Sequence, residues 1–496
     1  MMNSLNAWAA LPEIVLLAAA LAVLAVDLFV SDARRNLTYA LTLVALGVVA
    51  AICIAQLGDD AVARAFGRMY VADPMAQVLK VFACLCTALM LVYAQGYARD
   101  RGLWKGELFT LALFTLLGIF VMISAGNLLV IYLGLELQSL SLYALVALKR
   151  DDARATEAAM KYFVLGALAS GFLLYGMSML YGATGTLDIQ TLARNIGTGQ
   201  VPNRAALVLG TVFVVAGLGF KLGAAPFHMW VPDVYHGAPT PVTIMVGSAP
   251  KLAAFAIAFR LLVEGLLALA VDWRQMLILL ALASLAIGNV TAIAQSNLKR
   301  MLAYSTIGQM GFMLLGMLSG VVGATPLATA NAYGAAMFYA ITYALTTLGT
   351  FGIILLLARD GFEAEEIADL KGLNRRSPWY AFVMLLLMFS LAGIPPTMGF
   401  YAKLVVLQAL LGDGITAANV WLAVIALAFS LIAAYYYLRV VKVMYFEEPA
   451  DLCPIVATQD MRIALSLNGA LVLVIGLLPG YLLKLCADAM TKALGG

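Results

Sequence analysis

The sequence predicts an all-α polytopic membrane protein with about fourteen transmembrane helices. Three observations predict this fold class: 64% of the 496 residues are hydrophobic, only 11% are charged, and the apolar residues fall into long runs. Soluble domains carry roughly 25% charged residues, so the 57 ionisable side chains of this chain, 30 basic and 27 acidic, cannot coat soluble domains of this total length. A net charge of +3 is also too small to indicate the basic surface that binds nucleic acid. A soluble enzyme and a nucleic-acid-binding protein are therefore excluded.

Fourteen apolar spans can be marked along the chain, most of them near the roughly 20 residues that a bilayer crossing requires. Their approximate limits are 11–30, 37–57, 75–95, 107–125, 127–148, 153–181, 205–231, 239–262, 273–294, 301–318, 329–358, 378–411, 420–441 and 463–485. Arg34 and Arg35 follow the first span and no basic residue precedes it, which favours a membrane helix over a signal peptide.

The distribution of basic residues supports this division, because cytoplasmic loops are enriched in Lys and Arg. With the N-terminus outside, 17 Lys and Arg fall on the cytoplasmic side, 8 fall on the opposite side and 5 lie inside spans, which accounts for all 30. The bias predicts fourteen spans with both termini on the outer side of the membrane.

Two spans are too long for one uninterrupted helix. Span seven (205–231) is interrupted at Gly223 and Pro226, and span twelve (378–411) is interrupted from Gly393 to Gly399. Broken helices at membrane depth are tolerated only where they line a polar cavity, and paired broken helices point to inverted repeats around an ion path. Because the two spans lie five apart, we expect a five-helix repeat (spans 4–8) that recurs inverted (spans 9–13). The expected divisions are 1–106 (three N-terminal helices), 107–262 (first repeat), 263–441 (second repeat) and 442–496 (C-terminal connection and span 14).

Charged residues inside the spans are the candidates for function. Each costs about 2.5–3.5 kcal/mol at a helix centre, so each must face the bundle interior, find a partner or touch water. Glu136 lies in the middle of span five, Lys221 and Lys403 lie beside the two breaks, and Lys251 lies deep in span eight. A lysine desolvated in such a place can pick up and release a proton, and proton relays are a common reason for such residues. Structural alternatives stay open: a carboxylate that caps a neighbour for Glu136, helix capping for Lys221 and Lys403, and snorkelling for Lys251.

Two other lysines are less decisive. Lys161 lies nine residues into span six and is either a member of the relay, a partner of Glu136 or a snorkelling side chain. Lys80 lies only six residues into span three, so snorkelling is the simpler interpretation. The role of Lys80 stays open at this point.

The chain has two histidines and no sign of a cofactor site. Because imidazole titrates near neutral pH, His228 suits a relay between Lys221 and Lys251, with a structural hydrogen bond as the alternative; a structural role is favoured for His236. The histidines lie eight residues apart without a carboxylate cluster, which is a poor metal site. Five scattered cysteines form no CxxC pair, and neither a P-loop nor a GxGxxG after a strand is present. We therefore expect no metal and no cofactor in this chain.

The residues around the first break carry a resemblance to a known family. The run KLGAAPFHMW from Lys221, followed by PDVYHGAPTPVT from Pro232, resembles the proton-translocating antiporter-like family. This family supplies the large membrane subunits of respiratory complex I and of Mrp antiporters. The segments GSAPK (from Gly247) and NLKRMLAYSTIGQ (from Asn297) fit the same family, and the resemblance covers essentially the whole chain.

The resemblance implies a function and a set of site residues. It implies a proton-translocating membrane subunit in the bacterial inner membrane, with both termini periplasmic, coupled to NADH oxidation and quinone reduction in other subunits. NAD, FMN, iron–sulfur clusters and quinone are then expected in partner subunits, and the expected partners are neighbouring antiporter-like and small membrane subunits, the lipid bilayer, protons and water. A sodium/proton antiporter subunit of Mrp type is the alternative, and a membrane scaffold with a vestigial polar axis is a third hypothesis. The family's relay positions fall on Glu136, Lys161, Lys221, His228, Lys251 and Lys403.

Overall fold

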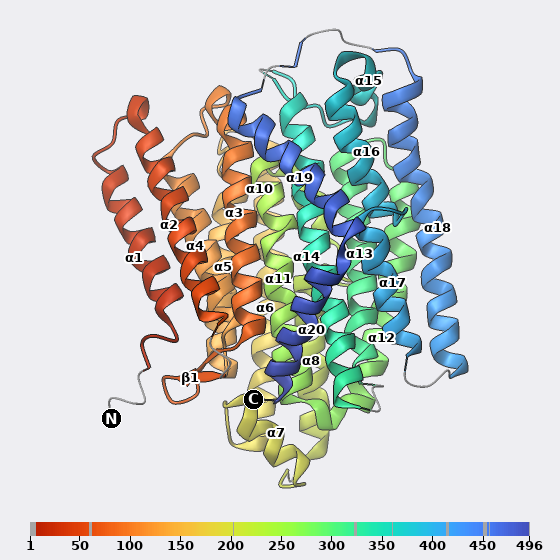
Figure 1. Ribbon diagram of the computed structural model, residues 1–496. Helices are drawn as coiled ribbons and strands as arrows, with labels where there is room; N and C mark the ends of the chain where they lie inside the picture. Colours follow the sequence, from red (N-terminus) through yellow and green to blue (C-terminus); the bar gives the residue numbers. More distant parts are fainter. Residues whose placement is uncertain are drawn as a thin grey trace.

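The structure, a computed structural model, is almost entirely helical (Figure 1). It describes residues 6–58, 62–201, 203–321, 325–359, 361–412, 416–449, 454–455 and 457–495. Within these residues, twelve helices are long and apolar enough to cross a membrane, and two shorter apolar helices accompany them. Four of the five cysteines are buried and free, and Cys453 lies outside the described residues. The predicted all-α membrane fold is confirmed.

Each predicted span corresponds to one helix or to two consecutive helices. The N-terminal segment contains α1 (Leu11–Asp27), α2 (Asn36–Gln56), a hairpin of β1 (Ala63–Ala65) and β2 (Tyr70–Ala72), and α3 (Pro74–Asp100). The next region contains α4 (Gly106–Ile123), α5 (Leu128–Val146), α6 (Ala153–Thr184), α7 (Ile189–Gly197), α8 (Arg204–Leu222), α9 (Trp230–Gly237), α10 (Thr240–Gly247) and α11 (Ala249–Ala258). The remainder contains α12 (Ala270–Ile293), α13 (Leu298–Ser319), α14 (Pro326–Leu357), α15 (Leu373–Arg376), α16 (Pro378–Ala392), α17 (Met398–Leu411), α18 (Ala417–Phe446), α19 (Gln459–Leu477) and α20 (Pro479–Gly495).

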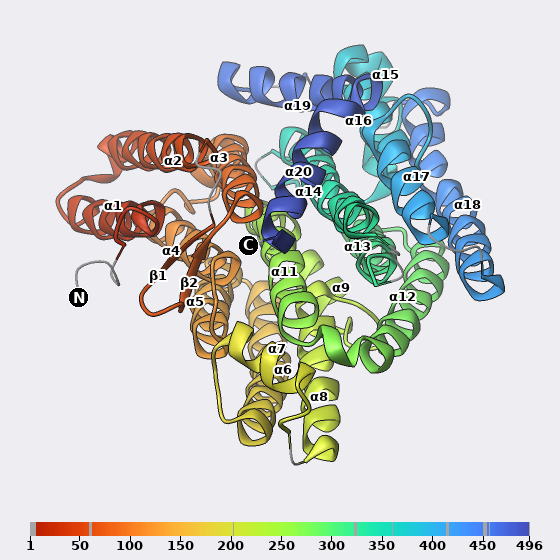
Figure 2. The same ribbon diagram turned by 60° about the horizontal axis from the view of Figure 1, so that its bottom comes forward.

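The helices form one bundle with α14 near its centre. Figures 1 and 2 both place α1 and α2 at one edge and α18 at the opposite edge. The most apolar stretches of α14 and of the segment Thr240–Gly265 are completely buried, whereas α18 is largely exposed. α14 packs against α10 and α11 on one side and against α16 and α17 on the other. It therefore lies between the two halves of the bundle.

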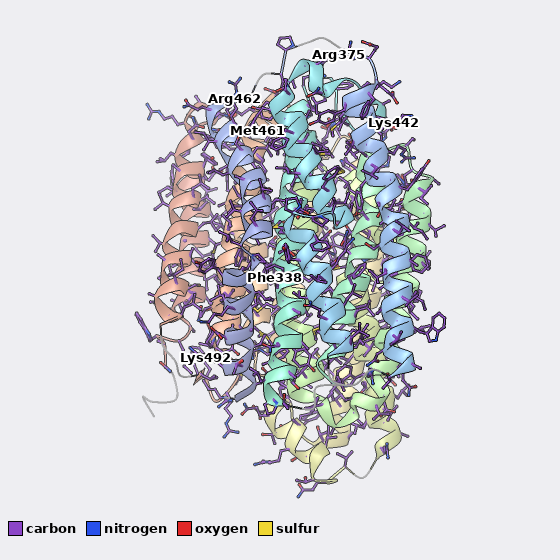
Figure 3. All side chains as sticks on the ribbon, turned by 45° about the vertical axis from the view of Figure 1, so that its right-hand side comes forward. Phe338, Arg375, Lys442, Met461, Arg462 and Lys492 are labelled. Atoms are coloured by element: carbon purple, nitrogen blue, oxygen red, sulfur yellow. The ribbon has the colours of Figure 1, made fainter. Side chains whose placement is uncertain are left out.

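The two ends of the bundle differ in the basic residues that they carry. Arg375, Lys442 and Arg462 lie at one end and Lys492 lies at the other (Figure 3). The first three are among the basic residues that the charge bias assigns to the cytoplasm. α1 begins and α20 ends at the same end of the bundle, opposite to Arg375 (Figures 1 and 3).

Both predicted breaks are present, and each begins at a glycine with a left-handed backbone. α8 ends at Leu222 and is followed by Gly223 with φ +77°; α16 ends at Ala392 and is followed by Gly393 with φ +85°. A Cβ at Gly223 would lie 2.7 Å from a methyl group of Val231, so a side chain there meets both strain and crowding. The chain resumes helix at α9 and at α17. The sequence prediction of two interrupted membrane helices is confirmed.

Two further interruptions were not predicted from the sequence. Span eight divides at Ser248, just before Pro250 and Lys251, so Lys251 lies in the first turn of α11. Span fourteen divides at Leu478 and Pro479 into α19 and α20, which run obliquely across the bundle in Figure 1. A proline at the start of each second helix lacks the N–H that a continuous helix requires at that point.

Lys80 is not a snorkelling side chain. Its side chain is fully buried, and its Nζ lies 2.6 Å from Glu13 Oε1 on α1 and donates to the Tyr70 hydroxyl at 2.9 Å. Tyr70 in turn donates to the other oxygen of Glu13 at 2.7 Å. This triad joins α1, β2 and α3 in the N-terminal segment, and it corrects the interpretation made from sequence depth.

We expect the triad to hold the N-terminal segment together. Removing one member of a buried ion pair costs about 3–5 kcal/mol, whereas replacing both members with apolar residues is close to neutral. Lys80→Met should therefore lower the thermal inactivation midpoint of the purified complex and the amount of this subunit in membranes. The double variant Glu13→Leu/Lys80→Met should recover most of both losses. Equal behaviour of the single and double variants would show that the pair has no such role.

Candidate functional site

Lys251 binds the end of the first broken helix. Its Nζ donates to the carbonyl oxygen of Leu222, the last residue of α8, at 3.3 Å, and it lies 5.2 Å from the ring centroid of Trp230. The Trp230 indole donates to the carbonyl of Phe220 at 3.0 Å. Lys251 is 1% exposed. Lys251 thus satisfies the Leu222 carbonyl at the end of α8, and the Phe220 carbonyl accepts from Trp230 in addition to the Gly223 N–H.

Lys403 binds the end of the second broken helix in the same way. Its Nζ donates to the carbonyls of Leu391 and Ala392, the last residues of α16, at 3.0 and 2.9 Å, and to Ser430 Oγ on α18 at 2.9 Å. The ring of Phe312 lies 5.2 Å from the ammonium group. Lys403 is buried as well. A buried lysine therefore binds the end of the helix at each break, and it comes from the following span (α11) at the first break and from the same span (α17) at the second.

This geometry lets a lysine change its protonation state without losing its place. The C-terminal end of a helix carries a partial negative charge that stabilises a cation, and its last carbonyls need donors. A neutral amine still donates two hydrogen bonds, so it can keep carbonyl partners after it has released a proton. A buried lysine held in this way can exchange protons.

Glu136 lies on α5 and Lys221 lies on α8, and Lys221 is hydrogen-bonded to a serine of α5. Lys221 donates directly to Ser139 Oγ, which lies one helical turn after Glu136 on α5. Ser170 of α6 donates to Glu136 Oε1. Among the described residues, no ion pair within 4.0 Å joins Glu136 to Lys221. The Ser139 hydroxyl itself donates to the Leu135 carbonyl of its own helix, so Ser139 holds Lys221 against α5 and the Glu136 charge acts on Lys221 through space.

Lys161 and His228 lie apart from this row. Lys161 is 43% exposed at the side chain and pairs at 2.8 Å with Glu157 on its own helix and with Asp233 on α9. Its pairing with Asp233 connects α6 to the short helix after the first break. His228 lies on that break and is half-buried; its Nδ1 has no hydrogen-bond partner among the described residues. The structure places neither residue in contact with Glu136, Lys221 or Lys251.

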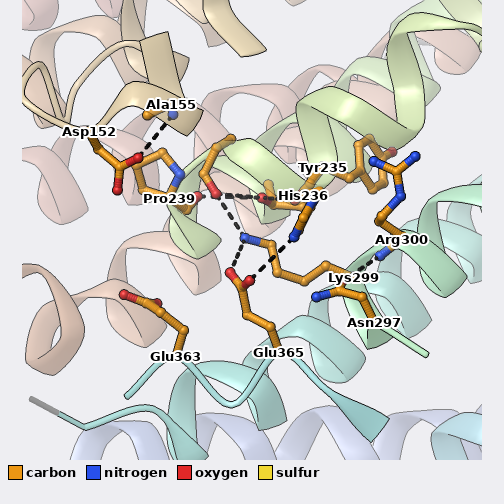
Figure 4. A network of polar contacts seen from close by, with 12 residues as sticks. Asp152, Ala155, Tyr235, His236, Pro239, Asn297, Lys299, Arg300, Glu363 and Glu365 are labelled. Carbon is orange, nitrogen blue, oxygen red and sulfur yellow. Dashed lines mark hydrogen bonds and ion pairs between the residues drawn. The ribbon is translucent and has the colours of Figure 1, made fainter. Parts of the chain in front are cut away.

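A charged network joins both halves of the chain at the end of the bundle that carries Arg375. Lys299 at the start of α13 donates to the Ala238 carbonyl at 2.9 Å and to Glu365 Oε1 at 3.1 Å (Figure 4). The other oxygen of Glu365 lies 3.7 Å from His236 Nε2 (Figure 4). Burial lowers the pKa of His236, and Glu365 opposes that shift. His236 thus lies at a contact between α9 and the loop that carries Glu365, as the structural interpretation of this histidine expects.

The same loop also anchors the N-terminal segment. Glu363 accepts hydrogen bonds from the Tyr97 hydroxyl on α3 at 2.9 Å and from Arg101, which directly follows α3, at 2.8 Å. On α9, Asp233 accepts from Arg300 at 2.9 Å. The loop between α14 and α15 therefore connects α3, α9 and α13 through its acidic residues.

Several groups that surround the lysines were not singled out from the sequence. Ser139 could have been identified from the sequence, because its spacing of three residues from Glu136 places both on one helix face. Trp230 lies inside the run that carries the family resemblance, but nothing there indicates that its ring lies beside Lys251. Ser430 and Phe312 come from distant helices, and only the fold brings them to Lys403.

A fold with two interrupted membrane helices, each ending against a buried lysine, defines an ion-translocating type of membrane subunit. The family described as NADH:quinone oxidoreductase/Mrp antiporter, TM, matches residues 125–433, which is more than half of the chain. The chain belongs to this family. NADH-quinone oxidoreductase subunit N from Herminiimonas arsenicoxydans is 62% identical over 497 residues, which cover 99% of this chain and all of the relative.

Solved structures agree with this assignment. A chain of respiratory complex I from Thermus thermophilus with bound aureothin superposes with a TM-score of 0.80 at 32% identity, covering 96% of this chain and 99% of that one. A chain of the Mrp complex from Dietzia has a TM-score of 0.83 at 21% identity, covering 99% and 97% of the two chains, and shows the fold alone. Within the family, the chain is therefore an antiporter-like membrane subunit of NADH-quinone oxidoreductase, of the subunit N type. That complex translocates protons, and the Mrp alternative is not favoured.

We expect the hydrogen bond from Lys221 to Ser139 to hold the lysine in its place against α5. Ser139→Ala removes the hydroxyl that accepts the lysine's hydrogen bond, so proton uptake coupled to NADH oxidation should fall while the subunit assembles normally. Ser139→Thr keeps a hydroxyl and should retain most of the activity. Ser141→Ala is a matched control, because Ser141 donates only to the Leu137 carbonyl of its own helix at 2.8 Å. Equal proton uptake in the Ser139→Ala and Ser141→Ala variants would contradict this role.

Proposed function

We propose that this chain moves protons across the membrane through a buried polar row of Glu136, Lys221, Lys251 and Lys403. The observation that carries the proposal is the matched placement of Lys251 and Lys403 at the ends of the two broken helices. Lysines in membrane interiors are costly and mark ion pathways. A structural scaffold would have no need of two buried lysines on two unwound helix ends.

Lys221 and Lys251 meet at the first break. Lys251 binds the carbonyl of Leu222, the residue next to Lys221. An ionised Glu136 favours the charged form of Lys221 by electrostatic attraction, and a weaker interaction between them favours release of the proton. A proton released by Lys221 then has Lys251 as its nearest lysine acceptor along the row.

His228 and Lys161 have supporting roles near the first break, where protons enter the row. His228 lies on the break itself and is half-buried, and imidazole titrates near neutral pH, so it can take up and release a proton there. Lys161 pairs with Asp233, four residues before Gly237 at the end of α9, and so controls the position of that short helix. In this scheme His228 carries protons toward the row and Lys161 positions the segment that it lies on.

We infer the orientation and the partners from the surface of the chain. The gathering of Arg375, Lys442 and Arg462 at one end supports a cytoplasmic location for that end and a periplasmic location for both termini. Glu136 is half-buried on a face where Leu133, Leu140 and Phe163 are exposed. A carboxylate there is costly against lipid, which supports a neighbouring membrane subunit of the complex on this face: a small subunit or another antiporter-like one.

Two further elements of the proposal concern the rest of the complex and the repeats. We infer that NAD, FMN, the iron–sulfur clusters and the quinone are held by partner subunits, so that this chain contributes proton transfer alone. The presence of one interrupted helix in each half, α8/α9 and α16/α17, supports a division into repeats at 107–262 and 263–441, flanked by 1–106 and 442–496.

Glu136→Gln should lower proton uptake while leaving the subunit content of the membrane unchanged. The amide keeps the shape and the hydrogen bond from Ser170 but loses the charge that favours the protonated form of Lys221. Glu136→Asp keeps the charge and should retain more activity. Proton uptake and NADH oxidation in inverted membrane vesicles measure both effects. Wild-type pumping by a normally assembled Glu136→Gln complex would remove Glu136 from the row.

Variants of Lys251 and Lys403 distinguish a proton relay from a structural scaffold. Met keeps most of the side-chain volume and removes the titrating amine, whereas Arg keeps the charge but hardly releases its proton. We expect Met and Arg at either position to abolish most proton transfer and, through tight coupling, to slow NADH oxidation. A scaffold would tolerate Met, since a buried charge is lost. If all four variants assemble and pump normally, the lysine row is wrong for this chain.

A further inference from the structure

Three aromatic side chains from different helices pack in series beside the first break. Tyr143 lies on α5, Tyr162 lies on α6 and Trp230 is the first residue of α9. The rings of Tyr143 and Tyr162 meet edge to face, with 4.7 Å between their centroids and an angle of 85° between their planes. The rings of Tyr162 and Trp230 are stacked, at 4.6 Å and 13°. The three rings, which we call the aromatic series, connect α5 and α6 to the helix that follows the break.

The aromatic series is tightly enclosed by the two helices that carry its tyrosines. All three side chains are buried. Gly166 lies one turn after Tyr162 on α6, and a Cβ at Gly166 would overlap the Tyr143 hydroxyl. The ring of Tyr143 therefore lies directly against the backbone of α6. Edge-to-face and offset-stacked contacts are the arrangements that aromatic pairs prefer, so this packing holds each ring in a defined orientation.

The last ring of the series contacts a lysine of the proposed proton row. Lys251 Nζ lies 5.2 Å from the ring centroid of Trp230. An aromatic ring attracts an ammonium group through its quadrupole, and the attraction is stronger where water is excluded. A neutral amine carries no such charge. Trp230 therefore acts on Lys251 mainly while the lysine holds its proton, and this action requires the ring to keep its place beside Nζ.

The contacts of Trp230 itself do not fix that place completely. Its indole N–H donates to the Phe220 carbonyl at 3.0 Å, which holds one edge of the ring, and the ring of Phe220 is tilted by 32° against it at 5.5 Å. One hydrogen bond leaves the indole free to turn about the bonded atom. The parallel ring of Tyr162 covers a face of the indole and opposes this rotation. Among the described residues, the Tyr162 hydroxyl has no hydrogen-bond partner, so the ring is the part of Tyr162 that makes this contact.

We propose that Tyr162 is a positioning residue for proton transfer, because its ring holds Trp230 against Lys251. Tyr143 supports Tyr162 from α5 in the same way. Tyr162 and Tyr143 take no proton themselves and act through Trp230 alone. This inference rests on the function proposed above, since it concerns the placement of Lys251 as a member of the row.

The first test separates the ring of Tyr162 from its hydroxyl. We expect Tyr162→Leu to slow proton uptake coupled to NADH oxidation by about two- to tenfold, the range that corresponds to the interaction of one aromatic pair. Tyr162→Phe keeps the ring and should pump like the wild type. Tyr175→Leu is the matched control on α6, because Tyr175 is exposed and its ring packs at 5.0 Å against Phe213, away from the series. It should also pump like the wild type.

Subunit content of the membrane is measured for every variant. If Tyr162→Leu assembles poorly, Tyr143→Leu takes its place, since it removes the support of Tyr162 from α5 and leaves the stacked pair intact. Tyr143→Leu should lower uptake by a smaller factor. Wild-type uptake in an assembled Tyr162→Leu complex, or in Tyr143→Leu where that variant replaces it, would overturn the proposal. An equal loss in Tyr162→Phe and Tyr162→Leu would overturn it as well.

The second test asks whether Tyr162 acts through Trp230. Residues that act through one another give non-additive effects when both are changed. Once Trp230→Leu has removed the ring beside Lys251, adding Tyr162→Leu should cause no further loss of uptake. A loss that multiplies in the double variant would show an independent structural role and would contradict the proposal. In a density map of the Tyr162→Leu complex, the Trp230 ring should be turned from its wild-type position, and an unmoved ring would contradict it too.

A Lys251→Met complex measured alongside distinguishes the positioning role from the function on which it rests. If Lys251→Met loses proton uptake while Tyr162→Leu keeps it, the role of Tyr162 is wrong and the lysine row stands. If Lys251→Met pumps normally, the function proposed for the row is wrong. Loss of uptake in Lys251→Met and Tyr162→Leu, with normal uptake in Tyr162→Phe and Tyr175→Leu, supports the positioning role.

Discussion

The contact on which the rest of the site depends is the one between a buried lysine and the carbonyl end of an interrupted helix. A continuous helix would satisfy its own carbonyls and leave a lysine ammonium in the membrane without partners. The breaks at Gly223 and Gly393 expose carbonyls at membrane depth, and Lys251 and Lys403 satisfy them. An exposed carbonyl at membrane depth would be costly alone, and so would a buried lysine. Together they make a stable polar site inside an apolar bundle, and they explain why both breaks begin at a residue that tolerates φ near +80°.

At one end of the molecule, ion pairs and hydrogen bonds hold the helices around these contacts in place. In the centre of the bundle, polar side chains surround the lysines. The acidic loop between α14 and α15 holds α3, α9 and α13 through Glu363 and Glu365 (Figure 4). α9 is also held by Lys161 and Arg300 through Asp233. These contacts hold in place the short helix that follows the first break. This helix therefore keeps its position when a group at the break changes its protonation state. α14, which lies between the two lysine sites, supplies hydroxyl groups in the interior of the bundle.

The sequence predicts the membrane class, the fourteen spans and the two breaks because those depend on local features: long apolar runs, interrupting Gly and Pro, and the placement of basic residues. It also singles out Glu136, Lys221, Lys251 and Lys403, because charge in an apolar run is visible without a structure. It does not show which lysines find partners. Lys80 and Lys161 resemble each other in depth along their spans, yet Lys80 is fully buried against Glu13 and Lys161 reaches the exposed Glu157. Such pairings join helices that are distant in sequence, as do Ser430 with Lys403 and Gln309 with Leu391.

The central claim is that Lys221, Lys251 and Lys403 belong to one hydrated proton path. The most direct measurement is a density map of the intact membrane complex at a resolution that shows ordered water. The account predicts water molecules in contact with each of the three lysines and a chain of water and hydroxyl groups that continues from Lys251 past α14 to Lys403. A map in which other parts of this subunit show ordered water but the region between Lys251 and Lys403 is dry and closed would contradict it.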